Sequence, residues 1–279
     1  MANFSMSDLK ELREQTGAGL ADVKKALEEA AGDREKALEI IRVKGLQSLS
    51  KREGRSAGMG LVAATVTDTP KGQRGTMVVV CAETDFVVKN EKFIAMADEV
   101  LAAAVESGVA DVESLLAAKS GDGTVNDAVD ARAAIIGEKL EVTQVVQLEA
   151  DAVDLYLHKS SPDLPPTVGV LVATDAAAAS VAHDVAMHIA AYAPEYLTRE
   201  DIPAEVVEKE RETLTEATKA EGKPEAALAK IVEGRMNGFY KDSVLLDQPY
   251  AKDPKTSVGA IVEATGGKIV GFSRLQAGA

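Results

Sequence analysis

The side chains that most often carry out covalent or metal chemistry are scarce in this sequence, which has one cysteine, Cys81, and three histidines, His158, His183 and His188. A nucleophile needs a nearby base, and a metal centre needs several ligands close together. His183 and His188 are five residues apart in an expected helix, so they do not share a face as residues four apart would. No phosphate-binding loop motif is present. We therefore expect a protein that is not an enzyme and that holds no metal and no cofactor.

The residue that most needs an explanation is Phe86, one of only five phenylalanines in the chain. It follows a run of β-forming residues, Met77–Cys81, in the segment CAETDFVVKN, and it lies between the charged residues Asp85 and Lys89. A phenylalanine just after a strand commonly closes the sheet edge as a core residue. The flanking charges favour an exposed corner instead, where an aromatic ring can insert into a partner with little loss of entropy. Asp85 itself has a second interpretation, as the cap of the following helix.

Composition limits the classes of protein that this chain can belong to. Its 279 residues, 46% hydrophobic and 27% charged, are typical of a folded protein with one large domain or two modest ones. The net charge of −14 argues against direct binding of nucleic acid, and the only basic stretch, 44–55, is more typical of a linker. Cys81 has no second cysteine to pair with and is expected to be buried. The sequence has no signal peptide and no apolar run near the roughly 20 residues that span a bilayer, so we expect a cytoplasmic protein without membrane contact.

Residues 1–47 predict a small domain of three helices, followed by a polar linker at 48–58. Ser5 and Asp8 have the spacing of a capping box, and Asp33 is placed to cap the third helix. The apolar residues of the second and third helices recur at helical spacing: Leu20, Val23 and Leu27, then Ala37, Ile40 and Ile41. So small a core is marginal, and such a unit usually presents a surface.

From residue 59 the pattern changes to that of an α+β core with antiparallel sheets, in two halves at 59–145 and 146–279. Strand, turn, strand and helix occur in this order in both halves, which predicts two related units; a coincidence of common motifs is the alternative. The first half continues with segments that read as two more helices and a strand: 111–119, 127–140 and 141–150.

Residues 203–240 interrupt the second half with two charged, amphipathic helices joined by a tight turn at Gly222–Pro224. The segment 269–276 reads as a last strand that returns to the second sheet. The helix pair is therefore expected to be an antiparallel helical hairpin inserted in this half. Its apolar seam is narrow, which fits an arm that projects and can join two copies of the chain, or a hairpin that lies flat on its own domain.

Four segments, in order along the chain, resemble the bacterial elongation factor Ts family. They are Leu9–Arg42, Thr84–Val87 (TDFV), Ala186–Ala191 (AMHIAA) and Val206–Met236. The resemblance implies a ubiquitin-associated-like N-terminal domain and a guanine nucleotide exchange factor. Its partner would be elongation factor Tu, both with GDP and free of nucleotide. The factor would promote GDP release during translation elongation by disturbing the site of Mg²⁺ and the phosphates.

The resemblance also implies roles for single residues. Asp85 and Phe86 match the pair that wedges beside the nucleotide site, within the four-residue motif that Thr84 and Val87 complete. Arg13 and Leu20 match positions that face the nucleotide domain of the GTPase. His188 matches a position in the half that faces a β-barrel domain of the partner.

Two departures from the family pattern bear on affinity. Ala21 stands where many members carry a larger apolar residue, so we expect a smaller contact by the N-terminal domain. The sequence ends at Ala279, where longer members continue into a helical module, so we expect that module's contacts to be missing.

Each assignment has an alternative that the sequence leaves open. Arg13 could be a solvated helix charge, Leu20 part of the small core, and His188 a hydrogen-bonded core histidine. The turn at 17–19 could serve only to stop a helix. For the whole protein, the alternative is a non-catalytic adaptor with a ubiquitin-associated-like head and a dimerising arm.

Overall fold

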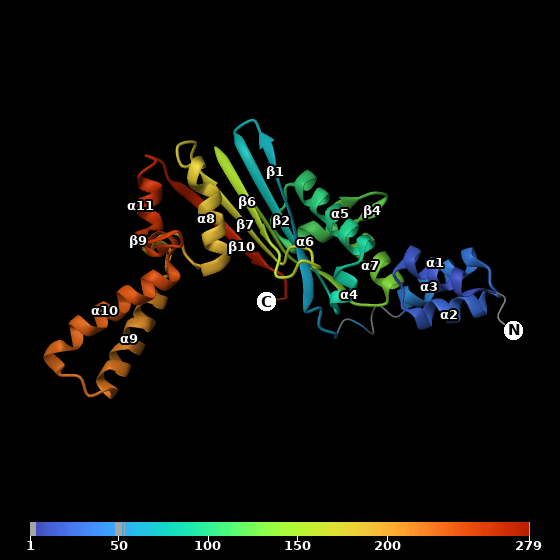
Figure 1. Cartoon of the computed structure of the whole chain (residues 1–279), viewed down its shortest axis with the longest axis horizontal. Helices are drawn as coiled ribbons and strands as arrows, with labels where there is room; N and C mark the ends of the chain where they lie inside the picture. The colour runs from blue at the N-terminus through green and yellow to red at the C-terminus, as the bar shows by residue number, and fades with distance from the viewer. Residues whose placement is uncertain (1–3, 48–51, 53, 279) are drawn as a thin grey trace.

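The computed structural model describes residues 4–47, 52 and 54–278 of the chain. Of the expected linker at 48–58, residues 48–51 and 53 lie outside the described residues. Figure 1 shows a layered central body with a small helical domain at one end and a helical hairpin at the other. We call the helical domain the head and the hairpin the arm.

The head consists of α1 (Met6–Thr16), α2 (Leu20–Glu29) and α3 (Arg34–Gln47). The capping box is confirmed, since Ser5 and Asp8 bond to each other's backbone at the start of α1. Asp33 accepts a hydrogen bond from the Lys36 backbone, as expected for the cap of α3. The three helices bury a common apolar core that includes Leu12, Val23, Leu27 and Ala37.

The first half of the body is a three-stranded antiparallel sheet in the order β1-β2-β5. Its strands are β1 (Met59–Thr69), β2 (Gly72–Ala82) and β5 (Leu140–Ala150). One face packs against three helices: α5 (Glu91–Ser107), α6 (Val112–Ala117) and α7 (Val125–Ile136). A short hairpin joins α6 to α7: β3 (Lys119–Ser120) and β4 (Gly123–Thr124). The central strand β2 is buried along its second half because it has helices on one side and the second sheet on the other.

The second half contains a three-stranded antiparallel sheet in the order β10-β7-β6. Its strands are β6 (Ala152–His158), β7 (Val168–Thr174) and β10 (Ile269–Gln276). Two helices cover its outer face: α8 (Ala179–Tyr192) and α11 (Val258–Glu263). Shorter elements lie between them in sequence: the 3-10 turns Arg199–Asp201 and Leu245–Asp247, β8 (Pro249–Tyr250) and β9 (Asp253–Ser257).

The two sheets pack face to face through a shared apolar layer that includes Val62, Met77 and Leu171. Glycines on the central strands allow this close approach. A Cβ added at Gly75 would lie 2.6 Å from a methyl carbon of Leu171, and one at Gly169 would lie 2.6 Å from a methyl carbon of Val62. The body is therefore a four-layer stack, with helices on both outer faces of a two-sheet sandwich.

The arm consists of α9 (Ala204–Ala220) and α10 (Glu225–Ser243). It lies between α8 and β10 in sequence, and its two helices pack mainly on each other as they extend from the body (Figure 1). At its base, the Tyr196 backbone pairs with Val244, and the Arg199 guanidinium lies 4.4 Å from the centre of the Tyr240 ring.

The predicted fold class is confirmed: an α+β protein with a three-helix N-terminal domain, antiparallel sheets and an inserted helical hairpin. The helix expected over 127–140 was wrong at its end. α7 stops at Ile136, because Gly137 adopts a left-handed conformation with φ of 90°, and Leu140 already belongs to β5. The short strands β3, β4, β8 and β9 were not expected. Within the described part of the chain, no helix is both long and apolar enough to span a membrane.

Candidate functional site

Phe86 is exposed at the corner where the chain leaves β2. It lies in the single-turn helix α4 (Asp85–Val88), and 82% of its surface is accessible. The side chains of the next two residues point inward: Val87 and Val88 are only 8% and 1% exposed and pack in the core of the first half. Buried valines thus anchor the turn that presents the ring, and the exposure expected for Phe86 is confirmed.

Two carboxylates tie this corner to the segment before β5. The Glu138 side chain accepts hydrogen bonds from the Thr84 backbone N–H at 3.0 Å and from the Thr84 hydroxyl at 2.7 Å. In the other direction, Glu83 accepts a bond from the Lys139 backbone N–H at 2.6 Å. Arg55 donates to both oxygens of Glu83, at 3.2 and 3.3 Å. Charged acceptors make these bonds stronger than neutral ones.

Asp85 does not cap a helix with its side chain. The cap position of α4 is Thr84, that of α5 is Asn90, and the Asp85 carboxylate instead pairs with the Lys89 ammonium at 2.9 Å. The cap interpretation of Asp85 is therefore wrong. The two residues are one helical turn apart and both side chains are partly exposed, so this ion pair contributes little to stability. The Asp85 carboxylate therefore remains accessible at the surface.

The head lies against the same corner. A single groove is lined by Arg13, Gly17 and Gly19 from the head and by Thr84, Phe86, Val87 and Glu138 from the body. The turn after α1 makes this approach close: a Cβ added at Gly17 would lie 3.0 Å from the side chain of Asn90, and Gly17 has a φ of 77°. The turn at 17–19 therefore does more than stop a helix, because it also fits the head against the start of α5.

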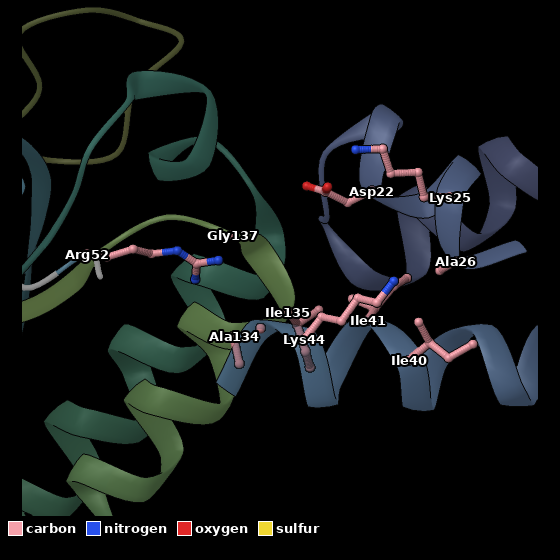
Figure 2. A pocket seen from close by; sticks show the side chains of 11 residues that line it. Asp22, Lys25, Ala26, Ile40, Ile41, Lys44, Arg52, Ala134, Ile135 and Gly137 are labelled. Atoms are coloured by element: carbon pink, nitrogen blue, oxygen red, sulfur yellow. The ribbon is translucent and has the colours of Figure 1, made fainter. Parts of the chain in front are cut away.

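A second junction joins the head to α7. Helix α3 crosses α7 so closely that a Cβ added at Gly45 would lie 1.8 Å from the Ala134 carbonyl oxygen. Figure 2 shows the cavity beside this crossing, with Asp22 and Lys25 on the head side and Arg52 on the side of the body. Arg52 donates a hydrogen bond to the Ala133 carbonyl at 3.0 Å. The head is thus held at two places, the α3–α7 crossing and the turn against Asn90.

Arg13 and Leu20 are both on the surface of the head. Arg13 is exposed in the last turn of α1 and lines the groove. Leu20 is 50% exposed at the start of α2, beside Gly19, and does not belong to the buried core of the head. The interpretation of Leu20 as a core residue is therefore wrong, whereas Val23 and Leu27 of the same helix are fully buried.

His188 lies elsewhere, inside the second half, where it is 1% exposed. Its Nδ1 accepts a hydrogen bond from the Ala251 backbone N–H at 3.3 Å, so the ring N–H lies on Nε2 and donates to the Gln248 side-chain oxygen at 2.8 Å. The ring stacks on Tyr192, with 4.6 Å between centroids. Burial lowers the pKa of His188, and the bond with Gln248 opposes this shift in part. The structure matches the alternative of a hydrogen-bonded core histidine.

The structure thus brings together Arg13, Thr84, Phe86 and Val87, with Asp85 and Leu20 close by in sequence, and it leaves His188 apart. Sequence reasoning missed Glu138 and Asn90, which position the corner and the head. Among the described residues, no group of three or more histidine, cysteine or acidic side chains could hold a metal ion. The geometry is that of a groove between head and body with one prominent exposed ring, Phe86.

Comparison with known proteins identifies the family of this chain. The family described as “Elongation factor TS” matches residues 83–279. The chain is also similar to proteins named elongation factor Ts from Beutenbergia cavernae, an Arthrobacter species and Micrococcus luteus, at 59%, 57% and 56% identity. Each of these alignments covers 100% of this chain and 100% of the relative. The chain therefore belongs to the elongation factor Ts family.

Proposed function

We propose that this protein is a guanine nucleotide exchange factor that binds elongation factor Tu with GDP and promotes GDP release during translation elongation in the cytoplasm. Membership of the elongation factor Ts family supports the exchange role. The observation that carries the proposal is Phe86, an exposed aromatic ring on an anchored corner next to the head. The protein itself transforms no substrate, and its effect comes from binding.

The proposed mechanism uses the Phe86 ring as a wedge beside the nucleotide site of the GTPase. Bound GDP is held by phosphate contacts and by the charge of Mg²⁺. A ring inserted there would displace the groups around Mg²⁺ and so weaken the binding of GDP. The negative charge of Asp85 would in addition repel the phosphates of the nucleotide. Thr84 and Val87 fix the direction of the ring, one through Glu138 and the other through the core.

Binding energy from the rest of the surface offsets the cost of this distortion. Arg13 and Leu20 would bind the nucleotide domain of the GTPase from the neighbouring head. His188 would act on a second domain of the partner indirectly, by holding the Tyr192 ring on which it stacks. Tyr192 is itself exposed at the end of α8.

Factor and nucleotide must weaken each other's binding by the same ratio, because coupling between two sites is reciprocal. The factor therefore speeds exchange without selecting GTP over GDP, and the nucleotide concentrations decide which one binds next. Nucleotide-free elongation factor Tu is accordingly the form that the factor binds most tightly.

The direct test mixes the protein with elongation factor Tu that carries a fluorescent GDP analogue and follows release in excess unlabelled GDP. We expect release to accelerate with factor concentration and to reach a plateau. Binding without any acceleration would instead support the adaptor interpretation. Sedimentation of the free protein over a range of concentrations would test whether the arm joins two copies of the chain.

A further inference from the structure

The hydrogen bonds of the Phe86 corner follow a register that the backbone ladder has already set. The last pair of the antiparallel ladder between β2 and β5 is Ala82 with Leu140. In the same register the next pairs would be Glu83 with Lys139, then Thr84 with Glu138. Both pairs are connected, but each bond runs from a backbone N–H to a carboxylate instead of to a backbone carbonyl. Side chains thus continue the ladder for two residues after the backbones separate.

We propose that Glu138 is a positioning residue for nucleotide exchange: by holding Thr84 it keeps the Phe86 ring in the direction needed for insertion. This inference rests on the proposed function. Glu138 is suited to the task because its two oxygens take the two donors of one residue, the Thr84 N–H and hydroxyl. Phe86 follows only two residues later, so a shift of Thr84 moves the start of α4 and with it the ring.

The place of Glu138 in the fold supports the same role. It comes directly after Gly137, whose left-handed conformation ends α7 and turns the chain toward β5. The preceding residues of α7 are fixed from both sides: Ala134 lies under Gly45 of the head, and Ile136 packs in the core of the first half. The backbone that carries Glu138 is therefore rigid. A functional site needs such rigid support to hold a side chain close to its working position.

The experiment measures release of fluorescent GDP over a range of factor concentrations, which separates the plateau rate from the half-saturating concentration. For Glu138→Ala we expect a plateau rate at least about tenfold lower, because both charged hydrogen bonds to Thr84 are lost and one such bond alone corresponds to roughly this factor. Glu138→Gln should recover most of the rate, because its oxygen can accept from the Thr84 N–H while its amide donates to the hydroxyl. The matched control is Glu141→Ala, three residues along on β5, where the carboxylate pairs with the side-chain ammonium of Lys139 and not with Thr84. Its rate should stay at the wild-type value.

A double-mutant cycle distinguishes positioning from a general structural effect. If Glu138 acts through the ring, Glu138→Ala should have no further effect once Phe86→Ala has removed the ring. Additive losses would overturn the inference. Amide hydrogen exchange of the free wild-type chain provides a measurement without variants: the Thr84 N–H should be protected although it lies past the ladder. An unprotected Thr84 amide would also overturn it.

The remaining outcomes separate this inference from the proposed function. A wild-type chain that fails to accelerate GDP release overturns the exchange function, and with it the role of Glu138. A wild-type chain that accelerates release while Glu138→Ala does so equally well overturns only the positioning role. Exchange that falls for Glu138→Ala and recovers for Glu138→Gln, with equal melting temperatures, supports both.

Discussion

The sequence predicts one partner-binding ring in each half of the body, and the structure places the two rings differently. Phe86 in the first half is 82% exposed, whereas His188 in the second is 1% exposed. The charges that flank Phe86 are local in sequence, so its exposure could be inferred from its neighbours. His188 is surrounded in sequence by Ala, Met and Ile, and its polar partners come from residues about 60 positions later. A surface role can thus be read from local charges, while the burial of a polar ring depends on distant residues.

The largest effect on exchange is expected when the exposed Phe86 ring is removed, and this variant tests the difference between the two rings most directly. Phe86→Ala should slow GDP release at saturation by about 30- to 150-fold, corresponding to roughly 2–3 kcal/mol of contact made in the transition state. The melting temperature should hardly change, because the ring is exposed. Stopped-flow release and thermal unfolding of one preparation measure both quantities.

The matched control for Phe86→Ala is Phe93→Ala, seven residues later, whose ring is fully buried in the core of the first half. We expect this variant to lose about 3–5 kcal/mol of unfolding free energy and its folded fraction to exchange normally. If Phe86→Ala were the destabilised variant instead, Phe86 would be a core residue and the wedge would lie elsewhere.

The second effect concerns the buried ring. His188→Ala leaves the Gln248 side-chain oxygen and the Ala251 N–H without their partner, which should lower the unfolding free energy by about 1–3 kcal/mol. His183→Ala is the control on the same helix, because His183 is exposed and its bond to Asp154 should matter little. Chemical denaturation of the two variants checks this difference. Equal stability would mean that the network around His188 contributes nothing measurable.

The head should affect affinity and not the plateau rate. Arg13→Ala and Leu20→Ala are each expected to weaken the complex by about 1–2 kcal/mol, since each removes a surface contact. Titration calorimetry with elongation factor Tu would give the affinity, and release at saturation would give the rate. A plateau rate that falls as far as with Phe86→Ala would show that head and corner act in the same step.

A smaller effect follows from the pKa of His188. Burial lowers this pKa in the folded protein. Below the ordinary value of about 6.5, the unfolded chain therefore binds a proton at His188 and the folded chain does not. Stability from the neutral ring is complete above that pH and decreases as the pH falls toward the lowered pKa. Denaturation between pH 7.5 and 5 should show this loss in the wild type. His188→Ala should lack this component of the pH dependence, and an identical pH profile for the two proteins would contradict the prediction.

The smallest effect on exchange is expected from the arm. Replacing 206–237 with a short Gly/Ser link should leave GDP release within about twofold of wild type. The arm packs mainly on itself and lies at the opposite end of the body from α4, the turn that contains Phe86 (Figure 1). Tyr240 is kept in this variant because Arg199 stacks on its ring. Self-association and melting temperature should be recorded alongside release. A variant that does not fold would show that the arm is needed as part of the core.

Features that depend on residues close together in the sequence could be predicted. Patterns within one turn were correct: the Ser5–Asp8 capping box and the exposed Phe86. The order of the longer strands and helices in both halves was also correct. Contacts between distant segments were missed. Thr84 and Glu138 are 54 residues apart, so nothing near either residue indicates the bond between them.

The close contacts that glycines make with neighbouring segments could not be predicted from the sequence either. A glycine such as Gly45 or Gly75 reads as a weak point in a helix or strand. Only the fold shows that Ala134 and Leu171 occupy the space where a side chain would be. The end of α7 was missed for a related reason, because Gly137 could be assigned to a helix interior or to its end.

The insertion of the arm between α8 and β10 has a consequence for the order in which the protein folds. The head forms from contacts close in sequence, whereas β10 must find β7 across the whole intervening segment, and such distant pairings slow folding. The arm reduces this cost if it folds first. Its base brings the Tyr196 backbone against Val244, so a folded hairpin removes most of its own residues from the loop that has to close. A hairpin that forms early would in this way shorten the loop that closes when β10 pairs with β7.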